Sequence, residues 1–110
     1  MTKYLNNSPA ILAVGELGEL TMLNETLAAL ADPTRRKILD LLKKRGMAVN
    51  EIAVNFNITL PSLSHHLAAL KKANLVSATR DGQQIVYSLN LSVFEAVAKE
   101  LYTFFNKSKK

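Results

Sequence analysis

Leucines recur every three or four residues between Asn57 and Lys72, which is the spacing of one face of an α-helix. The stripe consists of Leu60, Leu63, Leu67 and Leu70. At about 100° per residue, the opposite side holds small, polar or weakly basic residues: Pro61, His65, Ala68 and Lys72, with Ser62 beside them. The pattern predicts a helix with one face in a core and the other free to enter a groove and form hydrogen bonds there.

The same periodicity predicts further helices at Ile11–Leu20, Thr21–Ala31, Pro33–Arg45, Val49–Phe56 and Leu91–Phe105. We expect Asp32 and Thr59 to cap the helices that follow them, because a side-chain oxygen at this position accepts a hydrogen bond from a free backbone N–H group. Gly46 is expected to end the helix before it.

After Asn74 the pattern changes to two short runs rich in β-branched and aromatic residues, Leu75–Thr79 and Gln84–Leu89, which are typical of strands. The turn between them, Arg80–Gln83, contains Asp-Gly, a strong hairpin signal because both turn positions often need a positive φ. A short helix, a turn, a second helix and a hairpin form a winged helix-turn-helix. We therefore expect a mainly α fold with a small β-hairpin, consisting of about five to six helices plus a two-stranded wing.

Length and composition fit one domain, since 48% of the 110 residues are hydrophobic. We expect a partly helical N-terminal extension over residues 1–20, the winged helix-turn-helix domain over residues 21–106, and a basic tail over residues 107–110. The net charge of +5 and the pI near 9.6 favour a polyanionic partner, with nucleic acid ahead of an anionic membrane. No apolar run approaches the roughly 18–20 residues of a membrane span, so we expect a cytoplasmic protein without membrane insertion.

The sequence lacks the residue patterns on which most enzymes and metal-binding proteins depend. The chain has no cysteine, which excludes disulfides, thiolate ligands and a thiol redox switch within it. It shows no nucleophile–base pair, no Gly-rich phosphate loop and no paired carboxylates at catalytic spacing. The two histidines, His65 and His66, are neighbours that point about 100° apart on a helix and are poorly placed to share one metal ion. We expect neither an enzyme nor a cofactor or metal site.

Three stretches resemble a known family: LADPTRRKILDLLKK (Leu30–Lys44), NEIAVNFNITLPSLSHHLAALKKANLV (Asn50–Val76) and RDGQQIVYSL (Arg80–Leu89). They resemble the ArsR/SmtB family of bacterial winged-helix repressors, and are most similar to its SdpR-like autorepressor branch. The resemblance covers about Leu20–Phe105. It implies a homodimer that binds a palindromic operator in double-stranded DNA and usually represses its own operon.

The best-known trait of that family is release of DNA on metal binding, and this chain departs from the motif for it. Where the family motif ELCVCDL has its cysteines, the chain has Ala48 and Asn50. A second family site uses Asp and His pairs on the last helix, which here offers Glu95 and Glu100, with Lys99 between them and no histidine. The resemblance implies a repressor, and these departures from the family motifs predict that it lacks the metal-sensing ligands.

The candidate DNA contacts lie on the leucine-stripe helix and on the wing. They are Thr59, Pro61, Ser62, Ser64, His65, His66, Lys72, Arg80 and Gln83. The helical wheel favours Ser62 and His65, whereas Ser64 and His66 match the family's recognition-helix motif. Two alternatives stay open, a half-buried structural role for His66 and a helix-dipole role for Lys72.

The last predicted helix is more apolar than a helix at the edge of a small domain needs. We expect it to pair with its mate in a homodimer, with the N-terminal helices taking part, although a stripe that covers only its own core is the simpler alternative. The candidate interface residues are Leu20, Leu23, Leu27, Phe94, Ala98, Leu101, Tyr102 and Phe105.

The sequence thus predicts a homodimeric DNA-binding transcriptional repressor. Two other interpretations remain, a winged-helix protein-interaction module controlled by a partner protein, and a repressor that senses an unidentified small ligand. For the DNA-binding repressor as well, a partner protein is a candidate for relieving repression.

Overall fold

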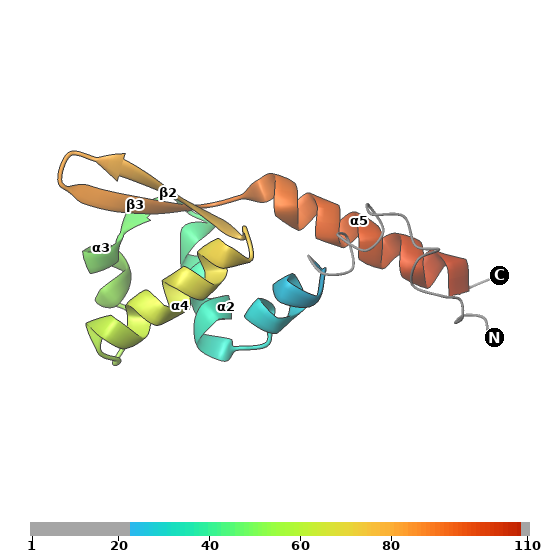
Figure 1. Cartoon of the computed structure of the whole chain (residues 1–110), viewed down its shortest axis with the longest axis horizontal. Helices are drawn as coiled ribbons and strands as arrows, with labels where there is room; N and C mark the ends of the chain where they lie inside the picture. Colours follow the sequence, from blue (N-terminus) through green and yellow to red (C-terminus); the bar gives the residue numbers. More distant parts are fainter. Residues whose placement is uncertain (1–22, 109–110) are drawn as a thin grey trace, which may run out of the picture.

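The structure, a computed structural model, describes residues 23–108, with side chains up to residue 106. In chain order it contains a helix over residues 23–30, α2 (Pro33–Leu42), β1 (Met47–Ala48), α3 (Val49–Ala53), α4 (Leu60–Lys72), β2 (Val76–Asp81), β3 (Gln84–Leu89) and α5 (Leu91–Ser108) (Figure 1). The predicted mainly α winged helix-turn-helix is confirmed. The expected helix Ile11–Leu20 lies outside the described residues.

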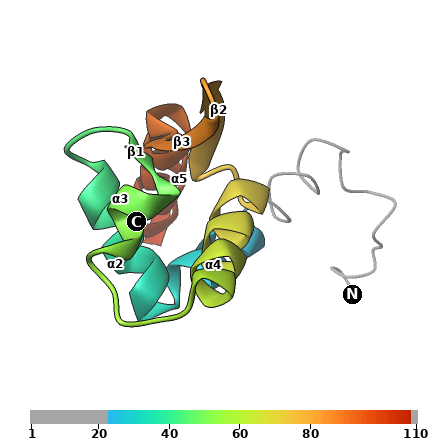
Figure 2. The ribbon, with the colours of Figure 1, turned by 90° about the vertical axis from the view of Figure 1, so that its left-hand side faces the viewer.

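Residues 23–89 form the body of the molecule, and α5 projects from it (Figure 1). Helices α2, α3 and α4 lie together below the sheet, and the hairpin of β2 and β3 extends past them at one end (Figures 1 and 2). Helix α5 starts at the other end of the sheet and runs away from the body for most of its length (Figure 1). The body and α5 therefore expose different surfaces at opposite ends of the molecule.

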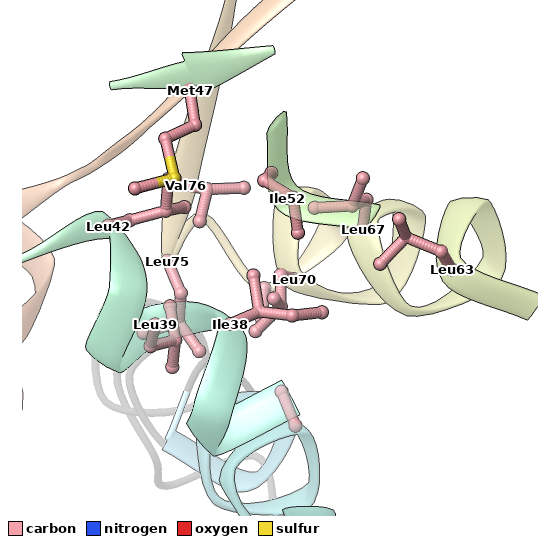
Figure 3. Packing of buried hydrophobic residues seen from close by; sticks show 12 residues of the cluster. Ile38, Leu39, Leu42, Met47, Ile52, Leu63, Leu67, Leu70, Leu75 and Val76 are labelled. Atoms are coloured by element: carbon pink, nitrogen blue, oxygen red, sulfur yellow. The ribbon is translucent and has the colours of Figure 1, made fainter. Parts of the chain in front are cut away.

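The core of the body is a cluster of aliphatic side chains from several elements (Figure 3). Its fully buried aliphatic members are Ile38 of α2, Ile52 of α3, Leu63, Leu67 and Leu70 of α4, and Leu75. The leucine stripe is confirmed for its last three members. It is wrong for Leu60, which is 53% exposed because the first turn of α4 extends beyond the buried cluster.

The sheet has three antiparallel strands in the order β1-β3-β2, one more than predicted. Strand β1 pairs Met47 with Tyr87 and has only two residues, too few for a period-two pattern to be visible in the sequence. In the wing, Asp81 pairs with Gln84, so the loop is Gly82-Gln83 alone and Arg80 belongs to β2. Only the first loop position has a positive φ, +67° at Gly82, as in two-residue hairpins with glycine first.

Two predicted helix ends are too late. Helix α2 ends at Leu42, because the chain must turn there to bring β1 onto β3. Gly46 follows this turn rather than ending the helix, and a Cβ atom on it would lie 3.1 Å from Cγ1 of Val86. Helix α3 ends at Ala53, and the side-chain amide of Asn55 donates to the carbonyl of Glu51 at 3.2 Å.

Helix α4 has a defined stop as well as a start. Thr59 caps its beginning, as predicted, with Oγ1 accepting a hydrogen bond of 3.2 Å from the N–H of Ser62. At its end Asn74 takes a φ of +61°, and the N–H groups of Asn74 and Leu75 donate back to Lys71 and Leu70 at 2.9 and 3.0 Å. This is a Schellman motif, in which asparagine replaces the usual glycine. The position and length of α4 are thus fixed at both ends.

Candidate nucleic-acid interface

The outer side of α4 presents a strip of small and polar residues, the polar strip. The exposed candidates are Thr59, Pro61, Ser64, His65 and Lys72, while Ser62 and His66 are half-buried. Lys71 and Lys72 form the basic end of the helix. Since Leu63, Leu67 and Leu70 hold the opposite side in the core, the polar strip faces outward from the body.

His66 points toward the start of α2 rather than outward. Its Nδ1 lies 3.7 Å from Oδ2 of Asp32 and has no hydrogen-bond partner, and only 17% of its side chain is exposed. This placement favours the structural alternative for His66, and contact of its ring with DNA stays a prediction. His65, the neighbouring residue, is exposed.

Asp32 lies at the junction where three helices meet. Its Oδ2 accepts a 2.9 Å hydrogen bond from the backbone N–H of Arg35, which is the predicted cap of α2. This hydrogen bond, and after it the charges of His66 and Arg35, hold the pKa of the Asp32 carboxyl below its ordinary value. The carboxylate therefore stays ionised while it faces His66 of α4.

The two arginines after Asp32 hold the end of the preceding helix. Arg35 donates from Nε to the carbonyl of Ala29 at 3.0 Å, and Arg36 donates from Nη1 to the carbonyl of Leu30 at 2.6 Å. The last carbonyls of a helix have no partner within it, so such donors satisfy them. This role of the two arginines is not among the sequence-based predictions. A helix that stops directly before Asp-Pro, with arginines one turn further on, is the signal for it.

The wing places its two candidate residues near its tip. Arg80 is exposed on β2 opposite Ile85, and Gln83 is exposed in the loop. Asp81 lies between them and is also exposed, so the tip carries one charge of each sign. Tyr87 and Leu89 of β3 pack against the core and attach the wing to the body.

Helix α5 carries the candidate dimer residues. Ala98, Leu101, Tyr102 and Phe105 are exposed, with Tyr102 at 69% and Phe105 at 61%, whereas Phe94 packs against the core. On the helix over residues 23–30, Leu23 is half-buried and Leu27 is exposed; Leu20 lies outside the described residues. No helix in the described part of the chain is long and apolar enough to cross a membrane.

Comparison with known proteins identifies the family. The model of bacterial regulatory proteins of the arsR family matches residues 32–78. The transcriptional repressor SdpR of Bacillus subtilis (strain 168) is 49% identical over 85 residues, which cover 77% of this chain and 94% of that protein. The chain belongs to the ArsR family.

Solved structures of ArsR-like proteins share this fold. An ArsR-like transcriptional regulator from Rhodococcus sp. RHA1 superposes with a TM-score of 0.78 at 25% identity, over 84% of this chain and 87% of that one. The homodimeric winged helix-turn-helix DNA-binding domain of Mb0332 from Mycobacterium bovis has a TM-score of 0.68 at 30% identity, over 91% and 90%. The ArsR-family chain is thus a DNA-binding transcriptional regulator and not an enzyme.

The stretch in which the resemblance puts the metal ligands is engaged in other contacts in this ArsR-family chain. Ala48 is buried in β1, and its N–H donates to Oε1 of Glu51 at 2.9 Å, while Arg45 pairs with Oε2 at 3.0 Å. These two contacts, the backbone hydrogen bond first, lower the pKa of Glu51. Within residues 23–106 no group of three or more His, Asp or Glu side chains is placed to hold a metal ion. The absence of a metal switch stays a prediction.

Proposed function

We propose that the protein is a homodimeric repressor that binds a two-fold symmetric operator and occludes a promoter, its own among them. One observation carries the proposal: the side of α4 opposite its buried leucines is an exposed strip of small and polar residues. Such a strip fits the major groove, where serine hydroxyls and a histidine ring form hydrogen bonds to base edges. The similarity to the repressor SdpR supports repression as the outcome of binding.

Dimerisation would supply the symmetry. The exposed apolar residues of α5 lie on a helix that runs away from the body, which supports a role in pairing two copies. In a symmetric dimer, two recognition helices about 34 Å apart would read half-sites one turn of DNA apart. The homodimeric state of the M. bovis domain supports the same assembly.

Release from DNA would not use the family's metal ligands. Ala48 and Asn50 stand where those cysteines would be, and Glu51 beside them is already bonded to a backbone N–H group and to Arg45. Metal titration of the DNA complex is the direct measurement for this part. Stoichiometric zinc that releases DNA would contradict it.

The test of DNA binding is a footprint on the DNA upstream of the gene. We expect a symmetric protected site. We also expect the double variant His65→Ala, Arg80→Ala to bind it at least tenfold more weakly, because it loses one contact of α4 and one of the wing in each protomer. Lys99→Ala is the control, since it removes an exposed charge of α5 and should leave binding unchanged.

Two outcomes would count against the proposal. Parent-like binding by the double variant would refute the assignment of the site. If the protein shows no salt-sensitive DNA binding even at low ionic strength, the interaction-module interpretation with a partner protein is the better one.

A further inference from the structure

The large exposed apolar side chains fall into two groups. One group lies on α5 and the helix over residues 23–30, where a partner subunit would cover it. The other group lies between the end of α3 and the first residue of α4 and consists of Val54 (83% exposed), Ile58 (39%) and Leu60 (53%). This segment is at the end of the body away from α5, so the proposed dimer leaves it uncovered (Figure 1).

Leu60 is the member of the second group that adjoins the polar strip. It is the first residue of α4, next to Pro61, and lies one turn before Ser64 on the same flank of the helix. The Cα–Cβ bonds of a helix tilt toward its N-terminus, so the side chain of a first residue extends past the helix start. A recognition helix contacts base edges with its N-terminal residues. In the proposed complex Leu60 would therefore meet the floor of the major groove.

The chemistry of leucine limits what it can read there. Leucine has no hydrogen-bonding group, and the 5-methyl group of thymine is the apolar feature that the major groove offers. Against the amino group of cytosine or the oxygen of guanine, the same side chain would displace water without replacing its hydrogen bonds. An exposed leucine at this place thus favours thymine and disfavours its polar alternatives.

We propose that Leu60 determines sequence specificity by contacting the 5-methyl group of one thymine in each operator half-site. The inference rests on the proposed function, since it requires α4 to enter the major groove. It assigns an apolar contact to a helix whose other candidate contacts are polar.

The experiment starts from binding sites selected in vitro from random DNA by the full-length protein. Each recurring thymine is then replaced by deoxyuracil, which removes the 5-methyl group and keeps the base-pairing edge. At one symmetric pair of positions we expect wild-type affinity to fall about fourfold for one replacement and about fifteenfold for both, as the burial of one methyl group per half-site implies. Leu60→Ala should bind the thymine site more weakly and be insensitive to the replacement at that pair.

Two further variants serve as controls. Leu60→Met keeps an apolar side chain of similar size and should retain sensitivity to the missing methyl group. Val54→Ala removes an even more exposed apolar side chain from the end of α3 and should keep the wild-type profile at every position. Since Leu60 is half exposed, Leu60→Ala should still fold, and its circular dichroism spectrum checks this.

The outcomes separate this inference from the proposed function. If wild type and Leu60→Ala respond alike to deoxyuracil at every position, the thymine contact is refuted while DNA binding stands. If Leu60→Ala binds the selected site as tightly as wild type, Leu60 makes no energetically important contact with DNA and the inference is again refuted. If the wild type selects no sequence, the proposed function fails and the thymine contact fails with it.

Discussion

A single carboxylate, that of Asp32, connects α2 and α4. It caps α2 through the N–H of Arg35 and faces Nδ1 of His66 on the recognition helix at 3.7 Å. The cap is a direct hydrogen bond, whereas the contact with His66 is longer and matters only when the imidazole is charged. The cap should therefore account for most of what Asp32 contributes to stability near neutral pH.

Replacement of Asp32 tests this division. Asp32→Ala should lower the free energy of unfolding by about 1 kcal/mol at pH 7, whereas Asp32→Asn should lose little because asparagine caps a helix equally well. The folded-state pKa of Asp32 is lowered, so its stabilisation is complete above the unfolded-state pKa and is lost as the pH falls through the folded value. The deficit of Asp32→Ala should shrink in acid.

Urea unfolding at fixed protein concentration, in steps from neutral to acidic pH, measures both effects. If Asp32→Asn is as unstable as Asp32→Ala at pH 7, the charge facing His66 matters more than the cap. If the deficit of Asp32→Ala does not change with pH, its origin is not the ionised carboxylate.

Some residue positions could be predicted from neighbours in sequence and others could not. The caps Asp32 and Thr59 depend only on a side-chain oxygen and the N–H group three residues on, so the sequence predicts them correctly. The exposure of Leu60 depends on whether another element covers the first turn of α4, and no periodicity carries that information. The placement of His66 against Asp32 likewise required the packing of α4 on α2.

At the scale of elements, the arginines that follow Asp32 decide how the helix over residues 23–30 joins α2. Arg35 reaches the carbonyls of both Ala28 and Ala29, at 3.5 and 3.0 Å, with one planar guanidinium group. Arg36 covers Leu30. By charge alone these basic residues are candidates for DNA contact. Their guanidinium groups instead donate hydrogen bonds to the last carbonyls of the preceding helix.

Arg35→Lys keeps the charge and removes the planar fork. We expect it to lower the free energy of unfolding by about 1 kcal/mol, because an ammonium group cannot reach both carbonyls. The slope of log K against log salt for DNA binding should stay unchanged, since no phosphate contact is lost. Urea unfolding and binding titrations at several salt concentrations measure the two quantities.

Lys44→Arg is the control, a swap at an exposed position that should change stability by less than about 0.5 kcal/mol. A salt slope that becomes shallower by about one unit for each lost phosphate contact, with stability unchanged, would place Arg35 at the DNA backbone instead.

Element types were easier to predict than element ends. Helices with a long apolar stripe and the hairpin have repeating patterns, so α4, α5 and the wing were found. The end of α2 at Leu42 and the existence of β1 follow from the pairing of Met47 and Ala48 with β3, about 40 residues further along the chain. Such a long-range contact leaves no local trace in the sequence.

At the scale of the whole molecule, the body and α5 have separate tasks in the proposed function. The body holds α4 and the wing, whereas α5 carries exposed apolar residues away from it (Figure 1). The sequence predicted this division because the last helix is more apolar than its own core requires. The structure was needed to show which residues of α5 pack inward, as Phe94 does.

Charge on the apolar face of α5 should separate the dimer into monomers. The double variant Tyr102→Glu, Phe105→Glu places two carboxylates where the proposed interface excludes water, and burying unpaired charges is costly. With about three to five phosphate contacts per protomer, the dimer should bind DNA with a salt slope of about −5 to −9, and a monomer with about half that value. Sedimentation velocity gives the oligomeric state, and binding from about 50 to 200 mM KCl gives the slope.

Thr103→Glu is the matched control, because Thr103 is exposed at the same end of α5, about 100° around the helix from Tyr102 and about 160° from Phe105. It adds a carboxylate without touching the apolar face, so dimerisation and the salt slope should stay those of the wild type. A double variant that remains dimeric would mean that α5 covers only its own chain. A monomeric variant that keeps the full salt slope would mean that each subunit reads DNA alone, and the two-fold operator would lose its basis.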